Sequence, residues 1–152
     1  MNMKYIHTNI IAKDWKKLSD FYIKVFHCKP VPPERNFKGD WLGKCTGVIN
    51  ASLKGMHLLL PGFDENGPTL EIFQYQENEY KPNPVANREG FGHIAFYVDD
   101  VEAVLEEMIS SGGTTLGEVI RKEFGKGTLI CVYAKDPEGN IIELQNYEPK
   151  NI

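Results

Sequence analysis

Two histidines and two glutamates are the residues of this chain best suited to act together in chemistry. They form two pairs, His7 with Glu71 and His93 with Glu143, and the two pairs occupy matching places in a repeated plan. A carboxylate on a covered sheet face is costly to bury without a partner, and no regularly placed Lys or Arg accompanies either glutamate. Two neutral imidazoles and two carboxylates suit one divalent ion such as Zn, Ni, Co, Mn or Fe(II). We therefore predict that these four side chains hold a metal ion.

An internal repeat places the two pairs. Each histidine lies in a short alternating segment that is typical of a strand, residues 5–11 in the first copy and 91–98 in the second. Seven residues after each histidine stands an aspartate, Asp14 or Asp100, that can cap a helix. A repeat is the economical explanation of this shared spacing.

Each copy is expected to contain a strand, a helix and three further strands. Apolar residues recur at helical spacing after each cap, and period-two alternation in the last strand puts the glutamate on the face opposite the residues packed under the helix. The expected apolar helix positions are Trp15, Leu18, Tyr22, Val25 and Phe26, then Val101, Val104, Leu105, Met108 and Ile109, with Gly112-Gly113 as the helix stop. The expected further strands are 29–34, 51–60 and 69–75, then 116–124, 128–134 and 141–147.

Composition limits the classes of function. The chain has 152 residues, 41% of them hydrophobic and 25% charged, which is enough for one folded domain. Its net charge of -4 and scattered Lys and Arg give no nucleic-acid footprint. Neither a bilayer-length apolar run nor an apolar secretory segment is present in the sequence, so we expect a cytoplasmic protein with no membrane partner. Three cysteines without metal or redox spacing, Cys28, Cys45 and Cys131, are expected to be reduced thiols in packing roles.

Five segments carry a resemblance to a known family: His7-Thr8, Asp20-Phe21-Tyr22, Leu70-Glu71-Ile72, Gly92-His93-Ile94-Ala95 and residues 136–144. They resemble the vicinal oxygen chelate superfamily, which includes glyoxalase I, methylmalonyl-CoA epimerase, extradiol dioxygenases and fosfomycin or bleomycin resistance proteins. The resemblance covers nearly the whole chain, and the order His, Glu, His, Glu is most similar to bacterial glyoxalase I. It implies an α+β fold of two βαβββ modules in a half-barrel arrangement, with His7, Glu71, His93 and Glu143 as the metal ligands.

The resemblance also implies a domain plan and an assembly. Residues 1–152 are expected to form a single glyoxalase-like domain, with module one at 1–77, a linker at 78–89 and module two at 90–150. Since a half-barrel leaves a sheet edge to cover, we expect a homodimer, with the site formed within one chain or across two.

The implied function is that of a metal-dependent lyase or isomerase acting on a small molecule. A proton would move next to a carbonyl through a metal-stabilised enediolate, with Glu143 as the base and Glu71 as its partner. An epimerase-like activity and an extradiol dioxygenase are alternatives, and a metal-free drug-binding resistance protein is an alternative of another class. Epimerases use a further Glu in the third strand of the first module, and His57 lies near that place; otherwise His27 and His57 are expected to be structural or surface residues.

Substrate contacts are expected from an insert and from aromatic residues. His7 to Glu71 spans 64 positions and His93 to Glu143 spans 50, and most of the extra length lies at 36–50, as a flap over the substrate or as a packed loop. Two departures from glyoxalase I weigh against a glutathione adduct: Ile11 replaces a basic residue and Tyr75 replaces an asparagine. The expected lining of an apolar pocket is Trp41, Phe73, Tyr75, Phe91, Tyr97 and Tyr147, with core packing as the competing role.

Overall fold

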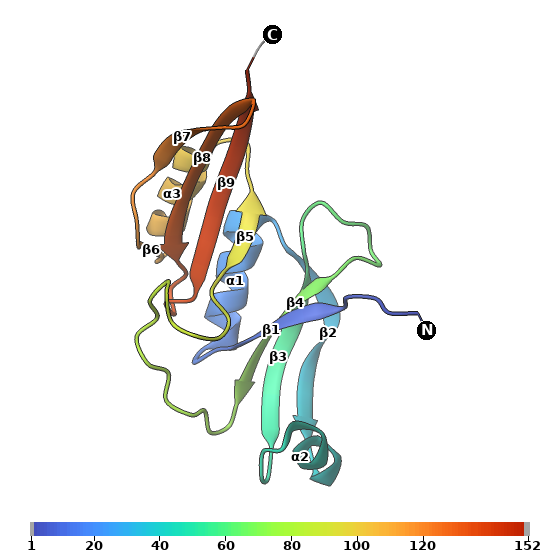
Figure 1. The fold of residues 1–152 in the computed structure, drawn as a ribbon. Helices are drawn as coiled ribbons and strands as arrows, with labels where there is room; N and C mark the ends of the chain where they lie inside the picture. Colours follow the sequence, from blue (N-terminus) through green and yellow to red (C-terminus); the bar gives the residue numbers. More distant parts are fainter. Residues whose placement is uncertain (1, 151–152) are drawn as a thin grey trace. The chain divides into compact units, whose positions relative to one another are not determined.

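The computed structural model describes residues 2–150 and divides the chain into two compact units between Tyr80 and Lys81 (Figure 1). The division falls inside the segment 78–89 that is expected to join the modules. Each unit has its own sheet, and the described residues of the two units contain three helices. This is the mixed α+β class that the sequence predicts. No helix within residues 2–150 has the length and apolar character needed to cross a membrane.

The first unit is a four-stranded sheet covered by one long helix. Its sheet order is β1-β4-β3-β2, in which β1 and β4 are parallel and the other pairs are antiparallel. The expected strand over 69–75 is present with those bounds, whereas the strand expected over 29–34 extends to Lys38. The elements are β1 (His7–Ile11), α1 (Trp15–Phe26), β2 (Lys29–Lys38), α2 (Asp40–Thr46), β3 (Ser52–Leu59) and β4 (Thr69–Tyr75).

Helix α1 determines which face of this sheet is buried. The Asp14 carboxylate accepts a hydrogen bond from the Lys17 backbone N–H at 3.1 Å, as a helix N-cap does. All five apolar positions expected on α1 are buried, and the helix contacts β3 and β4. Leu70 and Ile72 on β4 are also fully buried. Because successive residues of a strand point to opposite faces, Glu71 lies on the face away from α1.

The insert at 36–50 packs against the sheet instead of forming an open loop. It contains α2, whose Leu42 is buried in a small cluster with Ala51 and Leu53. Trp41, the residue just before Leu42 on α2, is 56% exposed, and its ring lies edge-on to the ring of Phe37 at 5.6 Å. Burial of Leu42 therefore anchors the segment, while contact of Trp41 with a substrate stays a prediction.

The second unit is a five-stranded sheet covered by α3. The order β5-β9-β8-β6 has β7 as a further partner of β8, and β5 is parallel to β9. The strand that the sequence predicts over 91–98 begins only at Ile94, so His93 lies just before it. The elements are β5 (Ile94–Tyr97), α3 (Val101–Ser110), β6 (Thr114–Thr115), β7 (Ile120–Phe124), β8 (Gly127–Lys135) and β9 (Ile141–Pro149).

One strand prediction in this unit is wrong. A single strand was expected over 116–124, but only 120–124 is a strand. The backbone N–H groups of Leu116 and Gly117 both donate to the carbonyl oxygen of Tyr133, each at 3.0 Å. Two consecutive donors on one acceptor interrupt the regular alternation of a ladder, so β6 and β7 are separate strands.

Helix α3 matches the second expected helix, although its apolar face is only partly covered. The Asp100 carboxylate accepts a hydrogen bond from the Ala103 backbone N–H at 2.9 Å, and Gly112 has the left-handed φ of +96° that ends the helix. Val101 and Met108 are buried, whereas Ile109 is 46% exposed. The expected helix is therefore present with a narrower buried face than α1.

A tight turn at residues 136–140 sets the start of β9. Asp136 is only 2% exposed, and its carboxylate accepts hydrogen bonds from the backbone N–H groups of Glu138 and Asn140 at 2.9 Å each. The side-chain amide of Asn140 donates to the other carboxylate oxygen at 2.7 Å. This turn fixes the pairing of β8 with β9, which places Tyr133 opposite Glu143.

Candidate metal-binding and catalytic site

The first predicted pair, His7 and Glu71, comes together in the first unit. Parallel pairing of β1 with β4 places Asn9 opposite Glu71 and puts His7 two residues earlier on the same strand. The Nε2 atom of His7 lies 3.2 Å from Oε2 of Glu71. Glu71 is buried, with 7% of its surface exposed, whereas the His7 side chain is 41% exposed. The carboxylate is therefore buried while the imidazole beside it is open to solvent.

His57 joins this pair, and its place is clearer in the structure than in the sequence. It lies directly opposite Glu71 in the antiparallel pairing of β3 with β4, and its Nε2 atom is 2.9 Å from Oε1 of Glu71. Its Nδ1 atom is 3.4 Å from the Thr69 hydroxyl. This arrangement suits a neutral ring whose Nε2–H donates to Glu71 and whose Nδ1 accepts from Thr69.

The charge state of His57 agrees with that arrangement. Burial lowers the pKa of His57 below its usual value, and the charges of Arg35 and His7 act in the same direction, against the opposing effect of Glu71. The imidazole therefore favours its neutral form beside the carboxylate.

Asn9 is a third partner of Glu71 that the sequence reasoning missed. Its side-chain amide donates to Oε2 of Glu71 at 3.3 Å. The strand register would have revealed both Asn9 and His57, since each is the direct cross-strand neighbour of Glu71. That register joins strands far apart in the sequence, so the local pattern did not reveal it.

The second predicted pair, His93 and Glu143, comes together in the second unit. The Nε2 atom of His93 lies 2.9 Å from Oε2 of Glu143, and the two side chains are 31% and 19% exposed. The His93 ring also packs on Tyr133, with 4.7 Å between ring centroids. Burial and the negative charge of Glu143 raise the pKa of Tyr133, so its phenol stays protonated at neutral pH.

The donor chemistry of the two pairs fits a divalent metal ion. Each pair brings an imidazole nitrogen and a carboxylate oxygen within hydrogen-bond distance, and within residues 2–150 no Lys or Arg forms an ion pair with Glu71 or Glu143. A buried carboxylate with neutral partners is suited to a cation. In the described part of the chain no three His, Cys, Asp or Glu side chains are arranged to hold a metal by themselves. The predicted ligands are thus found as two pairs, one in each unit.

The packing role expected of the three cysteines fits Cys28 and the partly buried Cys131, but it is wrong for Cys45, which is exposed on α2. Cys28 is buried, and its burial raises the pKa of the thiol to about 12. Burial, together with the charge of Glu143, also raises the pKa of Cys131. A raised pKa keeps a thiol protonated and unreactive at neutral pH, so neither Cys28 nor Cys131 is activated as a nucleophile.

The predicted substrate-contacting aromatics have different surroundings. Phe73 lies against the Glu71 cluster through an edge contact with His57, with 5.7 Å between ring centroids. Tyr75 packs beside the buried cluster under α2. Phe91 and Tyr97 are exposed, and the Tyr147 hydroxyl donates to the Phe124 carbonyl oxygen at 3.0 Å. Of the predicted aromatic contacts within residues 2–150, Phe73 is therefore the side chain that packs against the cluster around Glu71, through His57.

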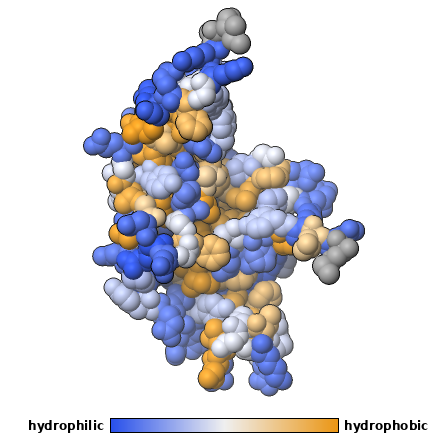
Figure 2. Space-filling view, viewed as in Figure 1, coloured by the Kyte–Doolittle hydropathy of each residue, from blue (hydrophilic) through white to orange (hydrophobic). Residues whose placement is uncertain are grey.

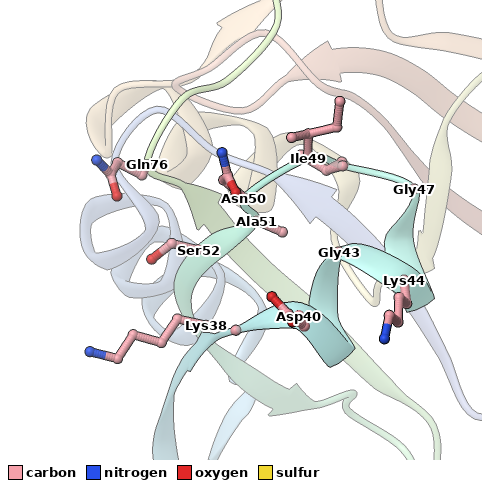
Figure 3. Close-up of a pocket in the computed structure, with 12 residues that line it drawn as sticks. Lys38, Asp40, Gly43, Lys44, Gly47, Ile49, Asn50, Ala51, Ser52 and Gln76 are labelled. Atoms are coloured by element: carbon pink, nitrogen blue, oxygen red, sulfur yellow. The ribbon is translucent and has the colours of Figure 1, made fainter.

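Two surface pockets of the first unit lie next to the insert instead of at Glu71. One, of about 560 Å³, is formed around α2 and includes Lys38, Asp40, Lys44 and Gln76 (Figure 3). The other, of about 810 Å³, is lined by residues 47–52 and 75–79 together with Ile11. His7, His57 and Glu71 line neither pocket. The candidate site is therefore defined by the two His–Glu pairs and not by either pocket.

Comparisons with known proteins identify the family and the relatives of this chain. The model of the Glyoxalase/Bleomycin resistance protein/Dioxygenase superfamily matches residues 4–144. A Vibrio parahaemolyticus protein called "Probable lactoylglutathione lyase" is 25% identical over 147 residues, which cover 94% of this chain and 90% of that protein.

Solved structures show the same fold. A glyoxalase family protein from Bacillus cereus has a TM-score of 0.75 at 16% identity, covering 97% of this chain and 95% of its own. A fosfomycin resistance protein, FosX, from Listeria monocytogenes, solved with Mn(II) and 1S,2S-dihydroxypropylphosphonic acid, has a TM-score of 0.55 at 16% identity, covering 95% of this chain and 92% of its own. Because the family model spans nearly the whole sequence, the chain belongs to the glyoxalase/bleomycin resistance protein/dioxygenase superfamily.

Proposed function

We propose that this chain is a metal-dependent lyase or isomerase of the glyoxalase type, which moves a proton at a carbon next to a carbonyl. The observation that carries the proposal is the pair of His–Glu contacts, His7 with Glu71 and His93 with Glu143, at matching places in the two units. The name of the Vibrio relative, "Probable lactoylglutathione lyase", supports the same activity class.

His7, Glu71, His93 and Glu143 would hold one divalent ion, of the group Zn, Ni, Co, Mn or Fe. The Mn(II) in the FosX structure supports a divalent ion in this fold. When bound, such an ion polarises a substrate carbonyl and so acidifies the neighbouring C–H bond.

Glu143 is the residue suited to remove the proton. His93 contacts its Oε2, so Oε1 remains available to accept a proton from the substrate carbon. Return of that proton to the adjacent carbon completes an isomerisation. Delivery of a proton to the original carbon from the opposite face, by Glu71 in its protonated form, completes an epimerisation, after which proton exchange with solvent restores both carboxyl groups. Both outcomes conserve the substrate's atoms and electrons, so no further reactant is needed.

The substrate class is a small 2-oxo compound or thioester. The relative's name points to a glutathione adduct, whereas Ile11 and Tyr75 stand where the resemblance to glyoxalase I leads us to expect a basic residue and an asparagine. A 2-oxo or thioester compound without the glutathione peptide reconciles these two observations. The residues proposed to contact it are Trp41, Phe73, Tyr75, Phe91, Tyr97 and Tyr147.

The working form is proposed to be a cytoplasmic homodimer of one glyoxalase-like domain, 1–152, with modules at 1–77 and 90–150 joined by 78–89. Large apolar side chains exposed on both units support an assembly, and Figure 2 shows apolar surface on the viewed face. Examples are Ile49, Phe63, Phe91 and Phe124. Sedimentation equilibrium of the purified protein tests this, with a monomer mass at micromolar concentration as the contrary result.

Metal content is the measurement that tests the proposed function. We expect the purified protein to hold a stoichiometric transition metal or Zn ion by elemental mass spectrometry, and expect His7→Ala or His93→Ala to lose it. His27→Asn is the matched control, because His27 is exposed at the end of α1 and has a left-handed φ of 54° that asparagine tolerates. Wild-type protein that neither holds nor takes up metal would instead support a metal-free drug-binding protein.

A further inference from the structure

The two glutamates of the proposed site have unequal surroundings. Each is flanked by one residue on each neighbouring strand, and these flanking residues differ between the units. Glu71 lies between Asn9 on β1 and His57 on β3. The corresponding neighbours of Glu143 are Ala95 on β5 and Tyr133 on β8.

Glu71 is held through both of its oxygens by its own sheet. His57 contacts Oε1 at 2.9 Å, and Asn9 donates to Oε2 at 3.3 Å, the oxygen that also faces His7. Thr69 lies 3.4 Å from the far nitrogen of His57, which orients the ring. With its side chain 10% exposed and two flanking donors in place, the Glu71 carboxylate has one preferred orientation.

Glu143 lacks such flanking donors. Ala95 has no polar side-chain atom, and Tyr133 packs its ring on His93. Among residues 2–150, His93 is the side chain that pairs with the Glu143 carboxylate. The Glu143 side chain is also more exposed than that of Glu71, at 19% against 10%.

We propose that His57 and Asn9 are positioning residues that fix the Glu71 carboxylate in the orientation needed for metal binding, a support that the Glu143 carboxylate lacks. This inference rests on the proposed function, because it concerns how one ligand of the proposed metal site is held. Hydrogen bonds to a ligating carboxylate orient it before the metal arrives, so their loss weakens binding without removing a ligand.

Metal affinity of the His57 variants tests the positioning role. The dissociation constants of the metal-free protein for Zn²⁺ and Mn²⁺ are measured by competition with a chromophoric chelator, alongside the Co²⁺ absorption spectrum. We expect His57→Phe to weaken binding by about 10- to 100-fold, and His57→Gln, whose amide N–H can replace the donor, to restore most of it. Asn9→Ala is expected to weaken binding and Asn9→Ser to weaken it less.

Tyr133→Phe is the matched control, since Tyr133 has the equivalent place opposite Glu143 and Phe keeps the ring against His93. It should leave the affinity unchanged. Thermal unfolding of each metal-free variant separates lost positioning from lost folding. Unchanged affinity in both His57→Phe and Asn9→Ala, or equal losses in His57→Phe and His57→Gln, would overturn the positioning role.

The unequal support of the two glutamates has its own test. Glu71→Gln should weaken metal binding more than Glu143→Gln. The reverse order of affinities would overturn the inference with the proposed function intact. If wild-type protein takes up no metal, the proposed function itself fails, and the two failures are therefore distinguishable.

Discussion

The Nε2 atom of His93 lies 2.9 Å from Oε2 of Glu143, and this contact leaves Oε1 of the carboxylate without a hydrogen-bonding partner among residues 2–150. An oxygen in that state can accept a proton from a substrate. The Glu143 carboxylate therefore has one oxygen paired with His93 and one available oxygen, which suits its proposed role as a general base.

Glu143→Gln should therefore abolish most turnover. Removing a general base typically lowers the rate by about 10²- to 10⁴-fold. The measurement is steady-state conversion of a 2-oxo compound, with the hemithioacetal of glutathione and a 2-oxoaldehyde assayed beside it. Glu148→Gln, an exposed position later on β9, should retain full activity. Wild-type rates in Glu143→Gln would show that another group is the base.

Metal should stabilise the fold as well as support activity. A ligand present at 100 times its dissociation constant adds about 2.7 kcal/mol to the free energy of unfolding. Thermal or urea unfolding with and without Zn²⁺ or Mn²⁺, after chelator treatment, measures this. His7→Ala should reduce the gain. A melting temperature that is independent of every metal tried would contradict the proposed site.

Asp136→Ala should destabilise the second unit by about 2–3 kcal/mol, because a buried carboxylate accepting several hydrogen bonds is lost and its donors are left without acceptors. Urea unfolding gives the value. Asp64→Ala is the comparison: Asp64 is exposed and accepts from the Asn66 backbone N–H, so its loss should cost less than about 1 kcal/mol. Equal effects of the two changes would show that the buried turn does not determine the stability of β8 and β9.

Gly55→Ala tests whether the spacing of β3 and β4 matters to the site. A Cβ at Gly55 would collide with the Ile72 carbonyl oxygen and the Phe73 ring, so the strands must shift. We expect a loss of about 1–3 kcal/mol in stability, as for overpacked cores, with weaker metal binding because His57 lies two residues further along β3. Gly117→Ala meets no atom within 4 Å and should be neutral. A stable Gly55→Ala protein with normal metal affinity would rule out this coupling.

Thiol chemistry should separate Cys28 from Cys45. At pH 8, iodoacetamide should modify the exposed Cys45 and spare the buried Cys28 until the protein unfolds. Burial raises the pKa of Cys28 from 9.0 to about 12, so its contribution to stability is complete below pH 9 and is lost as the pH rises toward 12. The fall in unfolding free energy above pH 9 should be smaller in Cys28→Ala. Rapid labelling of native Cys28 would show that it is accessible.

Local patterns predicted the elements that bury a clear apolar stripe. Helix α1 and strand β4 appear where expected, because Leu18, Tyr22, Leu70 and Ile72 follow the helical and the alternating spacing of a buried face. The two His–Glu contacts also lie where the repeat placed them. The spacing between repeats is a long-range signal that one sequence can carry.

The flanking residues of Glu71 could not be predicted in the same way. The positions of Asn9 and His57 are occupied by Ala95 and Tyr133 in the second copy, so the repeat gave no signal for them. Their closeness to Glu71 depends on pairing among β1, β4 and β3 that no local pattern reports. The same applies to the interrupted ladder at Leu116 and Gly117, where hydrogen bonding to one distant carbonyl decides the outcome. Tertiary pairing outweighs local preference in these places.

Duplication gives this molecule an internal reference. Each cross-strand neighbour of Glu71 has an equivalent beside Glu143, as His57 has in Tyr133. A substitution in one unit can therefore be compared with the equivalent substitution in the other unit of the same chain, under the same solution conditions. Exchanging the neighbours, by His57→Tyr together with Tyr133→His, asks directly whether the surroundings or the position of a glutamate decides its task.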